Sequence, residues 1–131
     1  MTSAGSPSDA GWPVTDESIR QVIQQMLVDG SWGRYHGPHC DALRGELGEY
    51  HAVEHVHLCS SGTSAVELAL RAVNVAPGDE VILAAYDYKA NFANVVALGA
   101  RPVLVDTLPG QPVMDPQQLS AALSSATKAI L

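Results

Sequence analysis

The stretch Ser60-Ser61-Gly62-Thr63-Ser64-Ala65 separates a short apolar run, residues 56–59, from a run with helical spacing, residues 65–73. This order predicts a strand, a tight turn and the start of a helix. Unpaired N–H groups and the positive end of the helix dipole stabilise an anion at such a start, and small residues let its backbone approach closely. The stretch therefore predicts a phosphate-binding turn, although a capped turn without a ligand has the same local pattern.

Strands and helices alternate on both sides of this turn. Apolar runs and turn signals predict strands at 54–59, 80–85, 102–106 and 127–131, with helices at 63–75, 89–98 and 116–124. Gly99 is placed to end a helix, and Asp115-Pro116 is placed to begin one. Nearly unbroken apolar strands are typical of a parallel sheet that is covered on both faces. The expected fold class is therefore α/β, with three layers and a mostly parallel sheet.

The residues upstream of this alternation have a different pattern. Residues 12–53 are predicted to form two N-terminal helices, ending near Gly30 and spanning about 39–50, with a glycine- and aromatic-rich loop between them. Residues 1–11 are rich in Ser, Gly and Ala and predict a flexible tail. Residues 54–131 are then a partial α/β domain.

The composition of the chain restricts its class and its partners. With 131 residues, of which 47% are hydrophobic, the chain suits one domain with a real core. Its 7 Lys and Arg against 14 Asp and Glu give a net charge of -7, which argues against nucleic acid as a partner. No apolar run approaches the roughly 20 residues of a membrane-spanning helix. Cys40 and Cys59 give no disulfide framework, so we expect a reduced, cytoplasmic protein.

Two groups of residues are candidates for a metal site. His36, His39 and Cys40 lie close together in the sequence, and His55 and His57 alternate along a predicted strand. Neither group has a carboxylate or a further cysteine at the spacing that completes a tetrahedral site. We predict no metal site.

Four sequence blocks follow one another along the chain, and together they are more informative than any one of them. They are Ser60 to Ala65, Pro77-Gly78-Asp79-Glu80-Val81-Ile82, Gly99-Ala100-Arg101-Pro102-Val103-Leu104-Val105-Asp106 and Thr127-Lys128-Ala129-Ile130. With these blocks the chain resembles, over about residues 12–131, the sugar-aminotransferase family of pyridoxal-phosphate enzymes, the DegT/DnrJ/StrS type. The resemblance implies the N-terminal part of the fold type I large domain. We expect this domain to be incomplete, because the sequence stops within an apolar strand with no helix after it to cover its face.

The resemblance also implies a set of cofactor-binding residues. It places the phosphate of pyridoxal 5'-phosphate on Gly62, Thr63 and Ser64, and it places the ring of Tyr88 against the pyridine. Without the resemblance, the preferred interpretation of Tyr88 is a half-buried residue at a strand-to-helix junction. Asp87 departs from the family, which has a small hydroxyl residue there, and Lys89 follows the tyrosine. A carboxylate near a phosphate weakens binding unless a cation or solvent neutralises it.

The activity that the resemblance implies belongs to a longer protein. The family's Schiff-base lysine and its pyridinium aspartate match positions beyond Leu131, so no residue here is assigned a catalytic role and we expect no transamination by the chain as given. The expected function is that of an N-terminal fragment of an aminotransferase for a nucleotide-linked keto sugar. An amino-acid donor, glutamate or glutamine, and a full-length homodimer follow from the resemblance. A non-catalytic phosphate-binding α/β module and a fragment of a dehydratase relative remain as alternatives.

The resemblance has a consequence for folding. The fold type I sheet places later strands of the chain between strand 54–59 and the other three predicted strands. We therefore expect strand 54–59 to lack hydrogen-bonding neighbours and the isolated chain to be marginally stable.

Overall fold

The computed structural model describes residues 16–131, so the tail predicted for residues 1–11 lies outside the described residues. The chain divides into two compact units, the first ending at His57 and the second comprising Leu58–Leu131. Each unit is described by itself.

The first unit contains two helices joined by a short turn. Helix α1 spans Glu17–Asp29, the 3-10 turn η2 spans Ser31–Gly33, and helix α2 spans Pro38–His51. The Asp16 carboxylate begins α1 by accepting the Ile19 N–H at 2.9 Å, and Gly30 ends it with a φ of 72°. Both helices expected from the sequence are confirmed.

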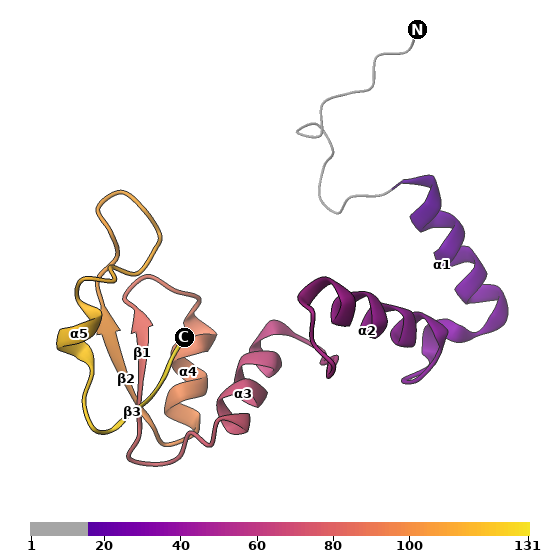
Figure 1. Cartoon of the computed structure of the whole chain (residues 1–131). Helices are drawn as coiled ribbons and strands as arrows, with labels where there is room; N and C mark the ends of the chain where they lie inside the picture. Colours follow the sequence, from indigo (N-terminus) through magenta and orange to yellow (C-terminus); the bar gives the residue numbers. More distant parts are fainter. Residues whose placement is uncertain (1–15) are drawn as a thin grey trace, which may run out of the picture. The chain divides into compact units, whose positions relative to one another are not determined.

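The second unit contains three strands and three helices. They are α3 (Gly62–Ala72), β1 (Glu80–Ala84), α4 (Lys89–Ala97), β2 (Arg101–Val105), α5 (Leu119–Ala122) and β3 (Thr127–Ile130). The strands form a parallel sheet in the order β2-β1-β3. Figure 1 shows β1 and β2 pointing the same way, with α3 and α4 next to each other beside the sheet. The expected α/β class with a parallel sheet is confirmed.

The central strand β1 forms the core of the second unit. Val81, Ile82 and Leu83 are completely buried, which is what an unbroken apolar run in a central parallel strand predicts. The cluster on one side of β1 comprises Leu70, Val75, Val81, Leu83, Val95, Leu98 and Ala100. This packing fixes α3 and α4 against the sheet.

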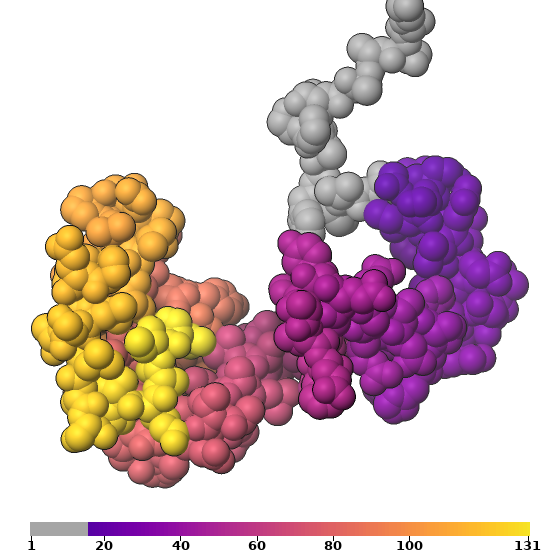
Figure 2. All heavy atoms as spheres, viewed as in Figure 1, coloured from indigo at the N-terminus to yellow at the C-terminus, as the bar shows by residue number. Residues whose placement is uncertain are grey.

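The edge strand β3 is less covered than β1. Its Ile130 is 52% exposed and the following Leu131 is 36% exposed. In the space-filling view, the residues of α5 and β3, coloured yellow, lie on the surface of this unit (Figure 2).

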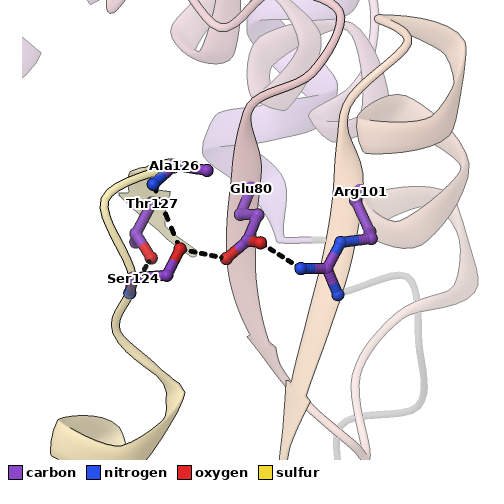
Figure 3. Close-up of polar contacts among 5 residues, drawn as sticks. All are labelled: Glu80, Arg101, Ser124, Ala126 and Thr127. Carbon is purple, nitrogen blue, oxygen red and sulfur yellow. Dashed lines mark hydrogen bonds and ion pairs between the residues drawn. The ribbon is translucent and has the colours of Figure 1, made fainter.

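A polar network holds the amino ends of the strands together (Figure 3). Glu80, at the start of β1, is 7% exposed. One of its oxygens pairs with the Arg101 guanidinium on β2, and the other accepts from the Ser124 hydroxyl at 2.7 Å. The Ser124 oxygen in turn accepts the Ala126 N–H at 3.1 Å just before β3. A carboxylate with so little access to water needs such partners.

Two element predictions were wrong. Residues 54–59 are not a strand, because an extended segment needs a partner and no described segment pairs with it. The helix predicted for 116–124 is only Leu119–Ala122. The Asp115 carboxylate accepts the Gln117 N–H at 2.9 Å and so caps a turn, while Ser124 and Thr127 bond locally and end the helix.

Among residues 16–131, none of the helices has both the length and the apolar character that crossing a membrane requires.

Candidate functional site

The start of α3 is a capped turn built from hydroxyl residues. Ser61 is the N-cap in an extended conformation, and its Oγ accepts the Ser64 N–H at 3.1 Å. The Ser61 hydroxyl also donates to the Ser64 Oγ at 3.1 Å, and the Ser61 carbonyl accepts the Ala65 N–H at 3.0 Å. This cap fixes the backbone of residues 61–65.

Two donors of this turn have no partner among the residues that the structure describes. Among residues 16–131, no acceptor lies within hydrogen-bonding geometry of the N–H groups of Gly62 and Thr63. Gly62 is exposed, and a Cβ added to it would have no heavy atom within 4 Å. The space in front of the turn is therefore open. Free N–H groups, nearby hydroxyls and the positive end of α3 together fit a phosphate.

Tyr88 lies in the connection that joins the end of β1 to the start of α4. It precedes α4 as the N-cap residue, and its side chain is 63% exposed. Both α3 and α4 begin at the edge of the sheet toward which β1 points (Figure 1). In parallel α/β sheets, ligands bind outside this carboxyl edge. The exposed ring of Tyr88 is thus available on the same side as the Ser61–Ser64 turn.

Asp87 has local partners that the sequence did not reveal. Its Oδ1 accepts the Tyr88 N–H at 2.6 Å, and its two oxygens accept from the Asn91 amide at 3.0 Å. Lys89 is exposed at the first position of α4. The Asp87 carboxylate is therefore bound to the start of α4, where the helix dipole also favours a negative charge.

Asn94 is a residue of this region that sequence reasoning missed. It lies in α4 and is 6% exposed, and its Nδ2 donates to the Thr63 carbonyl at 2.9 Å. The structure thus joins the Ser61–Ser64 turn to the helix that begins after Tyr88. The only signal in the sequence was an asparagine next to the apolar run 95–98, since a buried amide in a helix needs a partner.

No metal centre is apparent in the part of the chain that the structure describes. Within residues 16–131, His, Cys, Asp and Glu form no group of three or more that could hold a metal ion.

Comparison with known families gives one match that spans most of the chain. The family model of the DegT/DnrJ/EryC1/StrS aminotransferases matches residues 13–131. A similar curated protein is 3-amino-5-hydroxybenzoate synthase of Amycolatopsis mediterranei, which is 31% identical over 131 residues, 100% of this chain and 34% of the relative. Another is UDP-2-acetamido-2-deoxy-3-oxo-D-glucuronate aminotransferase of Pseudomonas aeruginosa, 38% identical over 115 residues, 88% of this chain and 32% of the relative.

Solved structures agree with this match. The PMP form of a putative sugar aminotransferase from Streptococcus pneumoniae superposes with a TM-score of 0.75 and 33% identity, over 84% of this chain and 28% of that one. Its PLP form gives a TM-score of 0.73 and 32% identity, over 89% of this chain and 29% of that one. The chain spans about a third of the length of the curated relatives that it matches.

Proposed function

The chain belongs to the DegT/DnrJ/EryC1/StrS aminotransferase family, whose members depend on pyridoxal phosphate, and we propose that its second unit supplies the cofactor-phosphate turn and the ring-stacking tyrosine of such an enzyme. The family and the cofactor inferred from the sequence are confirmed. The assignment of individual residues to the cofactor is our proposal.

The free donors at the start of α3 are the observation that carries this proposal. Gly62 and Thr63 offer backbone N–H groups, and the Thr63 and Ser64 side chains offer hydroxyls, while Ser61 holds the turn in shape. Hydrogen bonds to an ionised phosphate are about twice as strong as neutral ones. The net charge of -7 disfavours anions in general, so a local set of donors is what binding of this anion requires.

Tyr88 has a separate role in the proposal. Its exposed ring stacks on the pyridine and fixes the tilt of that ring, while Asp87 and Asn91 hold the backbone at the start of α4. Pyridoxal phosphate, when bound, supplies an electron sink for amino transfer. We assign neither the lysine nor the aspartate that this chemistry needs to a residue of this chain.

The substrate class in the proposal is a nucleotide-linked keto sugar, with glutamate or glutamine as amino donor. The relative from Pseudomonas aeruginosa supports this class, because its name describes an aminotransferase for a UDP-linked 3-oxo sugar acid. A homodimer in the cytoplasm completes the proposal and rests on the resemblance and on the cysteine content.

Titration with pyridoxal phosphate tests the two cofactor contacts. We expect Thr63→Ala and Tyr88→Ala each to weaken the affinity of the purified protein for pyridoxal phosphate by about tenfold, since each loses one favourable contact of about 1–1.5 kcal/mol. Absorbance and intrinsic fluorescence report the binding.

Tyr86→Ala is the matched control for the tyrosine. Tyr86 lies in the same turn and is 74% exposed, so its loss should leave the affinity unchanged. Negligible binding by the unaltered protein, or equal affinity in all four proteins, would contradict the proposed function.

A further inference from the structure

We propose that Asn94 is a positioning residue that sets the spacing between the phosphate turn and the ring of Tyr88. This inference rests on the proposed function, and it adds a residue that does not itself touch the cofactor. Its basis is the hydrogen bond from the Asn94 Nδ2 to the Thr63 carbonyl at 2.9 Å, which joins residues 31 positions apart in the sequence.

The surroundings of Asn94 make this bond a fixed one. Asn94 is 6% exposed and lies beside Val95, which is completely buried in the core cluster. A buried amide without a partner destabilises a protein by about 1–3 kcal/mol. Asn94 therefore keeps the bond to Thr63 instead of exchanging it for water.

The bond acts on the peptide group between Thr63 and Ser64. This group is planar, so its C=O and N–H turn together. Asn94 holds the Thr63 carbonyl, and the Ser61 Oγ holds the Ser64 N–H at 3.1 Å. The two contacts fix the orientation of this peptide from opposite sides. The Ser61 contact is local to the turn, whereas the Asn94 contact ties the turn to another helix.

That helix is the one that Tyr88 begins. Tyr88 is the N-cap residue of α4, and Asn94 lies further along the same helix. A helix of this length is a rigid rod on the scale of a cofactor. Holding Thr63 to α4 therefore holds the donors for the phosphate at a set distance from the aromatic ring. A ligand that reaches both points at once gains from this preorganisation, whereas free phosphate does not.

A double-mutant cycle tests the spacing. Pyridoxal phosphate and inorganic phosphate are titrated into the purified unaltered protein, Asn94→Ala, Tyr88→Ala and the double variant. We expect Asn94→Ala to lower the affinity for pyridoxal phosphate by about tenfold and the affinity for inorganic phosphate by less than about threefold. In the Tyr88→Ala background the second point of contact is absent. There, Asn94→Ala should lower the affinity for pyridoxal phosphate by less than about threefold.

Two further variants separate positioning from general destabilisation. Ser124→Ala removes the contact to Glu80 at the opposite edge of the sheet and should leave both affinities unchanged. Asn94→Asp keeps the size of the side chain but loses the donor. It should lower the affinity for pyridoxal phosphate at least as much as Asn94→Ala does. It serves where the alanine variant fails to fold, as judged by circular dichroism.

The outcomes distinguish this inference from the proposed function. If the unaltered protein does not bind pyridoxal phosphate, the proposed function fails. If the unaltered protein binds, and Asn94→Ala and Asn94→Asp bind pyridoxal phosphate as tightly as it does, the inference is overturned while the proposed function stands. An equal loss from Asn94→Ala with and without Tyr88 would also overturn the inference, because it would assign Asn94 a purely structural role.

Discussion

Gly99 is a position where the structure does not accommodate a side chain. It follows α4 with a φ of 76°, a conformation that residues with a Cβ rarely adopt. A Cβ added at Gly99 would lie 2.9 Å from the Pro77 Cγ and 3.3 Å from the Pro77 Cα. Gly110 also has a positive φ, 72°, but no heavy atom lies within 4 Å of its added Cβ. The two glycines therefore separate backbone strain from steric contact.

We expect Gly99→Ala to lower the free energy of unfolding by about 2–4 kcal/mol, and Gly110→Ala by only about 1–2 kcal/mol. Both variants force an alanine into the left-handed region, but only the first also pushes against Pro77. Urea unfolding followed by circular dichroism measures the difference. Equal losses would contradict the role of the contact with Pro77.

At the scale of the element, α1 depends on a titratable cap. The Ser18 hydroxyl donates to the Asp16 carboxylate at 2.6 Å and the Ile19 N–H donates at 2.9 Å. These two bonds, that of Ser18 first, lower the pKa of Asp16 below its ordinary value. A lowered pKa in the folded state means that the stabilisation is complete above the unfolded-state pKa and is lost as the pH falls through the folded-state pKa.

The chemical shifts of residues 17–22 should accordingly move from helical values toward random-coil values as the pH falls below about 4. Asparagine caps a helix without titrating, so Asp16→Asn should retain these shifts to lower pH. Nuclear magnetic resonance of both proteins between pH 6 and pH 2 measures this. An identical acid response in the two proteins would show that Asp16 does not cap α1.

The elements that the sequence predicted well are those whose ends have local chemistry. Asp16 and Gly30 mark both ends of α1, and Gly99 marks the end of α4. Residues 54–59 have an apolar pattern that resembles a strand, but pairing is a tertiary property that no local pattern contains. At 116–124, hydroxyl side chains competed with the helix for backbone groups.

The residues of the candidate site likewise differ in whether the sequence could predict their roles. Gly62, Thr63 and Ser64 are consecutive and begin a helix with one apolar face, so the turn could be predicted from the sequence. The partners of Asp87 lie within four residues of it, but which of several donors it bonds depends on the backbone of the turn. The bond from Asn94 to Thr63 depends on how α3 and α4 pack on the sheet, which sequence spacing does not determine.

At the scale of the whole molecule, residues 54–60 span the boundary between the two units. The first unit ends at His57, and within residues 16–131 no backbone hydrogen bond involves residues 54–60. Most side chains of this segment are exposed, among them Glu54. Segments with exposed backbone and few hydrogen bonds open at little cost in free energy, and proteases cut them first.

A protease specific for glutamate should therefore cut after Glu54 before it cuts inside the second unit. Glu80 is a matched site because it is 7% exposed and bonded through both oxygens, and we expect cleavage after it to be at least about tenfold slower. Mass spectrometry of the first products identifies the bond. In Glu54→Gln this cut should disappear while the second unit stays intact. First cleavage after Glu67 or Glu80 would mean that the second unit opens more readily than the segment between the units, contrary to the packing of β1 in its core.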